Sequence, residues 1–133
     1  NKSLWDGKDP VRPWFSASFR TSNGRKVYGL LGKNEVYSAF VCVALTTSVP
    51  RDESDLKSLS SENGTILVPY TVWSNKRGAG KALINKLLGL YRENPAVSRT
   101  VTLSPLSLLA RKFHLKNGAT ELSRSATCVN FEY

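Results

Sequence analysis

The feature of this sequence that most constrains its fold is a strand-like run followed directly by a cationic, glycine-containing loop and a helix-like run. The residues from Ile66 to Trp73 are rich in β-branched and aromatic side chains, a composition typical of a mostly buried strand. From Leu83 to Tyr91, apolar residues recur at the i, i+4, i+7 and i+8 spacing of one helical face. The sequence therefore predicts a strand–loop–helix unit in which residues 75–81 lead into the helix.

The loop itself, residues 75–81 (Asn-Lys-Arg-Gly-Ala-Gly-Lys), is predicted to bind an anion. Cations near a helix N-terminus oppose the helix dipole by roughly 0.3–1 kcal/mol each, so Lys76, Arg77 and Lys81 require a negative partner such as a phosphate. The two glycines allow backbone N–H groups to approach phosphate oxygens closely. The alternative interpretation is a tight strand-to-helix turn with solvated charges.

Two widespread phosphate loops do not fit this segment. A Walker A loop needs a glycine where Asn75 stands and a serine or threonine where Ala82 stands. A dinucleotide fingerprint needs three spaced glycines and an acidic residue about 20 positions further on. Only two glycines are present here, so the sequence excludes both classes of nucleotide site.

The rest of the chain alternates between helical and strand-like segments, as expected for an α/β domain. We expect residues 1–9 to form a polar loop and residues 50–64 a polar surface excursion with one helical turn. A short helix should begin at Pro13, and a second long helix, capped by Asn117-Gly118, should follow Pro105. The remaining elements are expected as strands at 26–31, 36–46, 100–103, 120–123 and 127–133.

Two segments resemble the signatures of the GCN5-related N-acetyltransferase (GNAT) superfamily. Residues 75–80 are similar to its pyrophosphate loop, commonly Gln/Arg-x-x-Gly-x-Gly/Ala, with Asn75 in the first place. Residues 110–119 resemble its helix ending in Phe-Tyr-x-x-x-Gly-Phe, and both segments occur in the superfamily's order. The resemblance implies an α/β (α+β) fold with a mixed, mostly antiparallel central sheet flanked by helices. It also implies a site for CoA or an acyl-CoA such as acetyl-CoA or malonyl-CoA.

A closer resemblance, over most of the chain, is to the catalytic domain of malonyl-CoA decarboxylases, which has this fold. The blocks that resemble it are Pro10-Val11-Arg12-Pro13-Trp14, Val43-Ala44-Leu45-Thr46, Thr102-Leu103-Ser104-Pro105, Phe113-His114-Leu115-Lys116-Asn117-Gly118-Ala119 and Val129-Asn130-Phe131-Glu132-Tyr133. The sequence departs from the family at Tyr70-Thr71-Val72-Trp73, where the family has Tyr-Ser-Ile-Ser with a catalytic serine. Thr71 or Trp73 then occupies the serine position, and the phosphate loop is shorter than the decarboxylase version.

The resemblance implies roles for individual residues. His114 matches the catalytic histidine of the decarboxylases, and a group near pKa 6.5 can give or take a proton at neutral pH. Thr71 is the candidate hydroxyl beside it, and the alternative for His114 is a structural residue at a helix end. The residues expected to contact CoA are Val72, Trp73, Lys76, Arg77, Gly78, Ala79, Gly80 and Lys81.

The chemistry remains open between two reactions. In a decarboxylation, His114 and Thr71 would stabilise the enolate that forms as carbon dioxide leaves. In an acetyl transfer, an amine would attack the thioester and His114 would protonate the departing thiolate. No carboxylate is evidently placed as the base for that attack, because most acidic residues lie between positions 52 and 62.

Composition agrees with one small domain over residues 1–133, since 41% of the residues are hydrophobic. No apolar run approaches the ~18 residues of a membrane span and no leader precedes the domain, so we expect a soluble, cytoplasmic protein. Cys42 and Cys128 lie in strand-like runs and are expected as buried free thiols. Two cysteines and one histidine are too few for a usual structural zinc site, and we expect no metal.

The net charge of +9 keeps a second class of function open. A basic surface fits an acidic partner or a nucleic acid, and the phosphates of CoA would engage only a few of the cations. Aromatic residues are not interleaved with these cations, as a base-stacking surface would need. A third class of function is a catalytically degenerate domain of the same fold that serves as a structural or interaction module, and the altered strand end at residues 70–73 supports it. The sequence does not indicate the oligomeric state.

Overall fold

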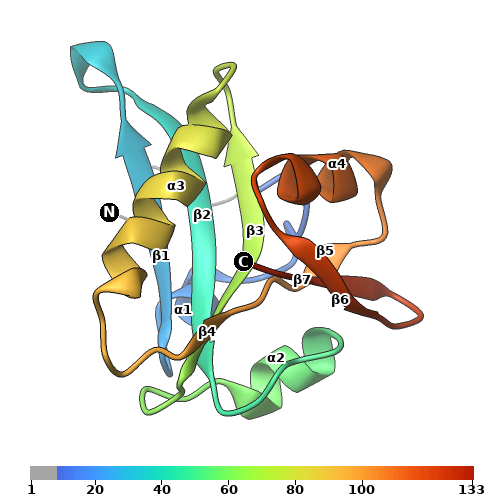
Figure 1. The fold of residues 1–133 in the computed structure, drawn as a ribbon. Helices are drawn as coiled ribbons and strands as arrows, with labels where there is room; N and C mark the ends of the chain where they lie inside the picture. Colours follow the sequence, from blue (N-terminus) through green and yellow to red (C-terminus); the bar gives the residue numbers. More distant parts are fainter. Residues whose placement is uncertain (1–8) are drawn as a thin grey trace.

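The computed structural model describes residues 9–133, and Figure 1 shows their arrangement. The helical elements are α1 (Ala17–Arg20), a 3-10 turn η2 (Lys33–Glu35), α2 (Glu53–Leu59), α3 (Ala79–Arg92) and α4 (Leu108–Lys116). The strands are β1 (Arg25–Leu31), β2 (Tyr37–Thr46), β3 (Ile66–Ser74), β4 (Arg99–Thr100), β5 (Ser104–Pro105), β6 (Thr120–Arg124) and β7 (Cys128–Glu132).

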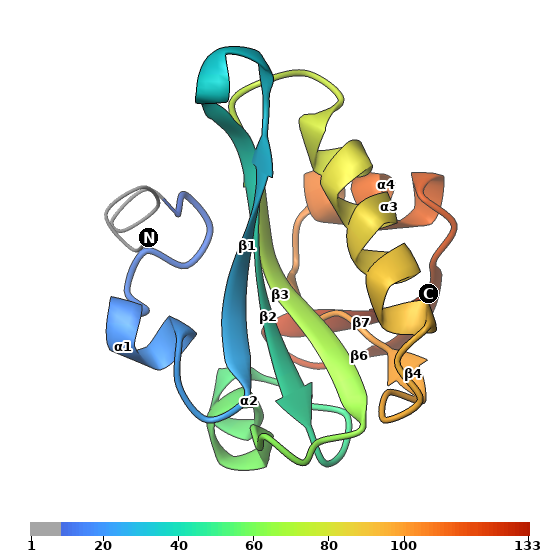
Figure 2. The same ribbon diagram turned by 90° about the vertical axis from the view of Figure 1, so that its left-hand side faces the viewer.

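The strands form two sheets, ordered β1-β2-β3-β4 and β5-β7-β6. All pairings are antiparallel except β3 with β4, which run parallel over only two residue pairs. In Figure 2 the first sheet is seen nearly edge-on, with α1 on one face and α3 on the other. This mixed, mostly antiparallel sheet flanked by helices confirms the predicted fold class.

Each face of the first sheet has its own apolar core because side chains alternate along its strands. On the α3 face, Leu83, Ile84 and Leu87 pack with Val41 and Leu67, and all five are buried. On the α1 face, the buried core has a different set of members, which includes Phe15, Cys42, Ala44, Val68 and Tyr70. The predicted strand–loop–helix unit is thereby confirmed as β3 followed by α3.

Two other helices differ from the expectation. The first begins at Ala17 rather than at Pro13, because the Ser16 side chain accepts a hydrogen bond from the Phe19 amide and caps the helix there. The polar 50–64 segment holds the seven-residue helix α2, capped by Asp52, rather than one turn. The predicted loop at residues 1–9 lies, apart from Asp9, outside the described residues.

The prediction of one continuous strand at residues 100–103 is wrong, because this part of the chain contains two short strands, β4 and β5. The Leu103 amide donates to the Pro69 carbonyl of β3 at 3.0 Å, but the next residue, Ser104, pairs with Val129 of β7. The chain therefore leaves one sheet for the other within this segment. The two sheets separate at this point. A local sequence pattern does not indicate which strand a segment will pair with in the folded protein.

A β-bulge in β3 lies beside this separation. Cys42 of β2 faces Thr71, whereas the next residue, Val43, faces Pro69, so Tyr70 is an extra residue in β3. The Tyr70 carbonyl accepts a hydrogen bond from the Arg12 guanidinium. The bulge is thus held by a buried side chain of the N-terminal segment.

Arg12 joins three parts of the fold. Its Nε donates to Glu53 of α2 at 2.8 Å, and its Nη2 lies 3.9 Å from the Cys128 sulfur of β7. Asp9 holds the backbone of this segment, because its Oδ1 accepts hydrogen bonds from the Val11 and Arg12 amides. The other Asp9 oxygen forms an ion pair with buried Arg20 at 2.7 Å.

Both cysteines are free and buried, as the sequence predicted. Within residues 9–133 no helix has the combination of length and apolar character that crossing a bilayer requires.

Replacing Arg12 with alanine is expected to lower the free energy of unfolding by about 3 kcal/mol or more, because it removes the ion pair of Glu53 and leaves the buried Tyr70 carbonyl without a donor. Glu53 would keep its hydrogen bond from the Trp14 indole. Urea unfolding at neutral pH measures the change. Arg92→Ala, which removes an exposed arginine at the end of α3, is the control and should cost less than about 1 kcal/mol. Equal stability of the Arg12 variant and the wild type would contradict this role of the guanidinium.

Candidate functional site

A cleft of about 390 Å³ lies where β3 and β5 diverge. Its walls come from the second half of β3, from β5, from α4 and from the first turn of α3, and the N-terminal segment contributes Pro10 and Val11. The cleft exists because the two sheets part there, so its position follows from the topology. The residues around it are Pro10, Val11, Pro69, Tyr70, Thr71, Val72, Trp73, Ser74, Gly80, Ser104, Pro105, Ser107, Leu109, Ala110, Phe113 and His114.

The structure brings the two candidate catalytic residues to this one cleft. Thr71 follows the β3 bulge and His114 comes from α4, and both side chains are buried and line the cavity. The Thr71 hydroxyl has no hydrogen-bond partner in the part of the chain described here. Buried hydroxyls in folded proteins are almost always satisfied, so this oxygen, like that of Tyr70 in the same wall, is free to bond a water or another group that enters the cleft.

His114 is oriented by Tyr133 and by aromatic rings. Its Nδ1 lies 2.7 Å from the Tyr133 hydroxyl, and its ring stacks on Phe131 with 5.3 Å between the centroids. If the Tyr133 hydroxyl donates this hydrogen bond, the proton of the neutral imidazole is on Nε2. Nε2 is then the donor that His114 offers to the cleft.

Burial keeps His114 neutral. It lowers the pKa of the imidazole from 6.5 to about 4, and burial likewise raises the pKa of Tyr133. At pH 7 the site therefore contains an uncharged imidazole and an uncharged phenol. A neutral imidazole can donate a hydrogen bond to a developing oxyanion without bringing a charge into the cleft.

The walls of the cleft carry no Asp, Glu, Lys or Arg side chain. Its remaining polar groups are hydroxyls, and the buried Ser104 hydroxyl is paired with that of Thr102 at 2.8 Å. In the described residues, no group of three or more His, Cys, Asp or Glu side chains is arranged to hold a metal. The site therefore offers neutral hydrogen-bond donors and an apolar wall.

The predicted phosphate loop lies at one end of this cleft. Gly78 has φ +82°, a left-handed conformation that favours glycine, and it precedes the first turn of α3. A side chain at Gly80 would stand 3.3 Å from the Phe113 ring, so glycine allows α3 and α4 to approach closely. Within residues 9–133 the Gly80 and Lys81 amides have no protein acceptor, as expected in a first helical turn.

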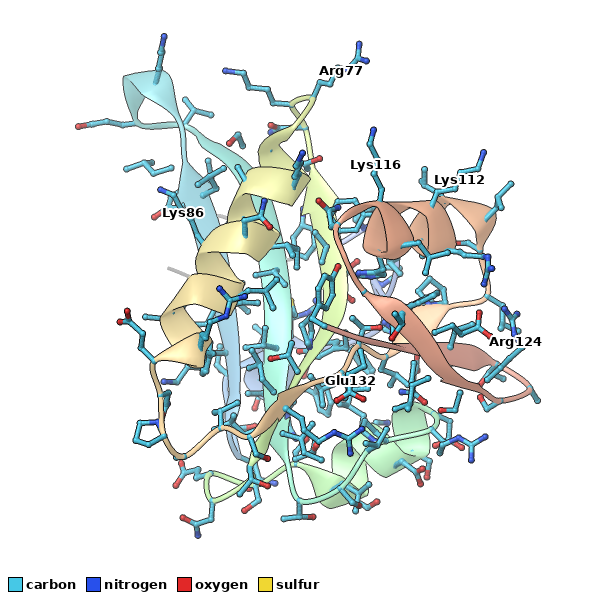
Figure 3. All side chains as sticks on the ribbon, in the orientation of Figure 1. Arg77, Lys86, Lys112, Lys116, Arg124 and Glu132 are labelled. Atoms are coloured by element: carbon cyan, nitrogen blue, oxygen red, sulfur yellow. The ribbon has the colours of Figure 1, made fainter. Side chains whose placement is uncertain are left out.

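The cations of the loop extend away from the protein. Lys76, Arg77 and Lys81 are exposed, and none forms an ion pair with a described carboxylate. Figure 3 shows Arg77 pointing outward at the end of the molecule where α3 begins. Of the other residues expected at a CoA site, Val72 and Trp73 line the cleft, whereas Ala79 is buried against the sheet.

Three contributors to the site were missed from the sequence. Tyr133, Ser104 and the Pro10-Val11 pair lie inside the blocks that resemble the decarboxylase domain, but nothing in those blocks assigns them a position. The contact of Tyr133 with His114 spans 19 residues and depends on how β7 lies beside α4. Only tertiary structure supplies such a pairing.

No protein-family model matches this sequence, and no curated protein does. Solved structures match, among them a GNAT-like decarboxylase, GphF, in complex with isobutyryl-CoA. It is 15% identical over 80% of this chain and 76% of that one, with a TM-score of 0.67. The malonyl-CoA decarboxylase from Cupriavidus metallidurans is 18% identical over 86% of this chain and 53% of its own, with a TM-score of 0.63. The enzyme from Rhodopseudomonas palustris is 27% identical over 75% of this chain and 26% of its own, with a TM-score of 0.56.

The chain thus spans about half of one malonyl-CoA decarboxylase chain and about a quarter of the other. It has the GNAT fold, and the solved structures similar to it include malonyl-CoA decarboxylases, as the sequence blocks predicted.

The lowered pKa of His114 predicts a loss of stability in mild acid. Between the unfolded pKa of about 6.5 and the folded value of about 4, only the unfolded state binds the proton, so this stabilisation is complete above pH 6.5 and declines as the pH falls. We expect a loss of about 2 kcal/mol between pH 7 and pH 5 in urea unfolding, and His114→Gln should remove most of it.

Because the chain has one histidine, an NMR titration reports His114 without an assignment problem. An imidazole signal that titrates near 6.5 in the folded protein would contradict the buried geometry.

Proposed function

We propose that this chain, which has the GNAT fold, binds a CoA thioester in the cleft and removes carbon dioxide from a 2-carboxyacyl-CoA of the malonyl type. The observation that carries the proposal is the uncharged cleft whose walls include both the unpartnered Thr71 hydroxyl and neutral His114. Those two groups are what a thioester oxygen needs as it takes on negative charge.

Each part of the proposed substrate can be matched to a group of residues with suitable chemistry. The amides and cations of residues 77–81 suit the pyrophosphate, since a helix N-terminus without a bound acceptor attracts phosphate. The end of β3, with Val72 and Trp73, suits the pantetheine arm. The acyl group would then lie beside Thr71 and His114, at the point where the sheets part.

In the proposed reaction the bond between Cα and the carboxylate carbon breaks. Carbon dioxide leaves, and the bonding electrons pass into an enolate whose charge lies on the thioester oxygen. Hydrogen bonds from Thr71 Oγ1 and from Nε2–H of His114 would stabilise that oxygen. A proton from water then adds to Cα to give the shorter acyl-CoA, while neutral His114 keeps its Nε2 proton.

Two features of the cleft favour this reaction over acyl transfer to an amine. Transfer needs a base to take the proton of the amine, and the cleft wall has no carboxylate. His114 is a poor base because its pKa is lowered to about 4. Decarboxylation needs no base, and an apolar wall disfavours the carboxylate of the substrate more than the neutral carbon dioxide product.

The solved structures support the proposal indirectly. A neighbour described as a GNAT-like decarboxylase was solved with isobutyryl-CoA, whose acyl group is uncharged. An uncharged acyl group suits a cleft of the composition found here. The identity of 15% transfers no residue role, so the argument for this chain depends on Thr71 and His114 themselves.

Thr71→Val and His114→Ala are each expected to lower turnover of malonyl-CoA by about 100-fold, because each removes one donor to the enolate oxygen, while the Kd for CoA changes little. Release of carbon dioxide and formation of acetyl-CoA, followed by chromatography, measure turnover. Thr71→Ser keeps the hydroxyl and should retain most of the activity. Undiminished turnover in both donor variants, or wild-type protein that binds CoA without releasing carbon dioxide from any 2-carboxyacyl-CoA, would refute the reaction.

Reversing one charge in the phosphate loop tests binding separately. Arg77→Glu places a carboxylate where the pyrophosphate is expected, so CoA affinity should fall by more than about 30-fold with the fold intact. Isothermal titration calorimetry measures the affinity, and circular dichroism checks the fold. Unchanged affinity for CoA would remove the loop from the site.

A further inference from the structure

The helix α4 divides its cations into two groups. Arg111 pairs with Glu121 of β6 and is neutralised there. Lys112 and Lys116 are exposed, and neither forms an ion pair with a described carboxylate. Like charges four residues apart on a helix repel one another, so a bound anion would stabilise this lysine pair by offsetting the repulsion.

These two lysines belong to the helix, α4, that forms one wall of the cleft, although neither lines the cleft itself. Phe113, which stands between them in sequence, lines the cleft and approaches Gly80 in the first turn of α3. Figure 3 shows Lys112 and Lys116 extending from α4 toward the same end of the molecule as Arg77. Lys86, in contrast, lies on the side of α3 that is turned away from α4.

Two elements that border the cleft, the phosphate loop and α4, therefore carry exposed cations at the same end of the molecule. The loop combines free amides with its cations, which suits the pyrophosphate, whereas α4 offers two ammonium groups and no free amide at this point. CoA carries one more phosphate, a monoester on the 3′ position of its ribose. Such a group bears about −1.5 to −2 charges at pH 7 and matches two ammonium groups.

We propose that Lys112 and Lys116 bind the 3′-phosphate of CoA, so that this chain selects free CoA thioesters over thioesters on a bare pantetheine arm. The inference rests on the proposed function, because it assigns a second phosphate subsite to the same cleft. It extends that function by identifying the carrier of the acyl group.

Calorimetric titration with CoA, 3′-dephospho-CoA and 4′-phosphopantetheine tests the assignment. At low salt the wild type should bind CoA about 10-fold more tightly than 3′-dephospho-CoA, as two exposed ion pairs allow. The double variant Lys112→Gln, Lys116→Gln should bind both with the weaker affinity. The preference should shrink at 0.5 M salt, since exposed charges are screened.

Two controls separate this subsite from its neighbours. Lys86→Gln removes one positive charge on the side of α3 that is turned away from α4 and should leave the preference for CoA intact. Arg77→Glu should weaken CoA and 3′-dephospho-CoA alike, because it acts on the pyrophosphate.

Equal affinities of the wild type for CoA and 3′-dephospho-CoA would overturn the inference and leave the proposed function standing. A preference that survives in the double variant would also overturn it. Failure of all three compounds to bind would refute the proposed function and this inference with it.

Discussion

The interaction on which the rest of the structure depends is that of the Arg12 guanidinium with the Tyr70 carbonyl at the β3 bulge. A bulge leaves a backbone group outside the ladder, and a buried carbonyl without a donor is costly. Arg12 supplies the donor and is itself compensated by Glu53. The bulge turns the following residue, Thr71, toward the opening between the sheets, so a contact from the N-terminal segment decides where a hydroxyl of the site lies.

Charge is segregated along the cleft in a way that suits a CoA thioester. Exposed cations lie on the phosphate loop and on α4, where water weakens the repulsion between them. The interior has hydroxyls, an imidazole kept neutral by burial, and apolar walls. Phosphates would remain near solvent, while the thioester would enter a region in which each hydrogen bond to a developing charge is strengthened.

The sequence predicted some elements well and others poorly, for identifiable reasons. The β3–loop–α3 unit was legible because its strand composition, glycines and helical periodicity are local. The strand expected at 100–103 was wrong because its residues bond to β3 and then to β7, and only the sheet arrangement dictates that change. Similarly, α2 needed its Asp52 cap and the burial of Leu56 to form in a segment whose polar composition suggested a loop.

By itself, the sequence predicted a GNAT-type fold, a glycine-containing cationic loop before a helix with anion binding as its proposed role, and Thr71 and His114 as candidates through resemblance to a family. Tertiary structure decided that these two residues share one uncharged cleft, that Tyr133 holds the imidazole, and that the Thr71 hydroxyl lacks a partner within residues 9–133. The division has a physical cause. Helical periodicity and glycine conformation act between near neighbours, whereas burial, pKa and hydrogen-bond partners depend on residues far apart in sequence that meet only when the two sheets are assembled.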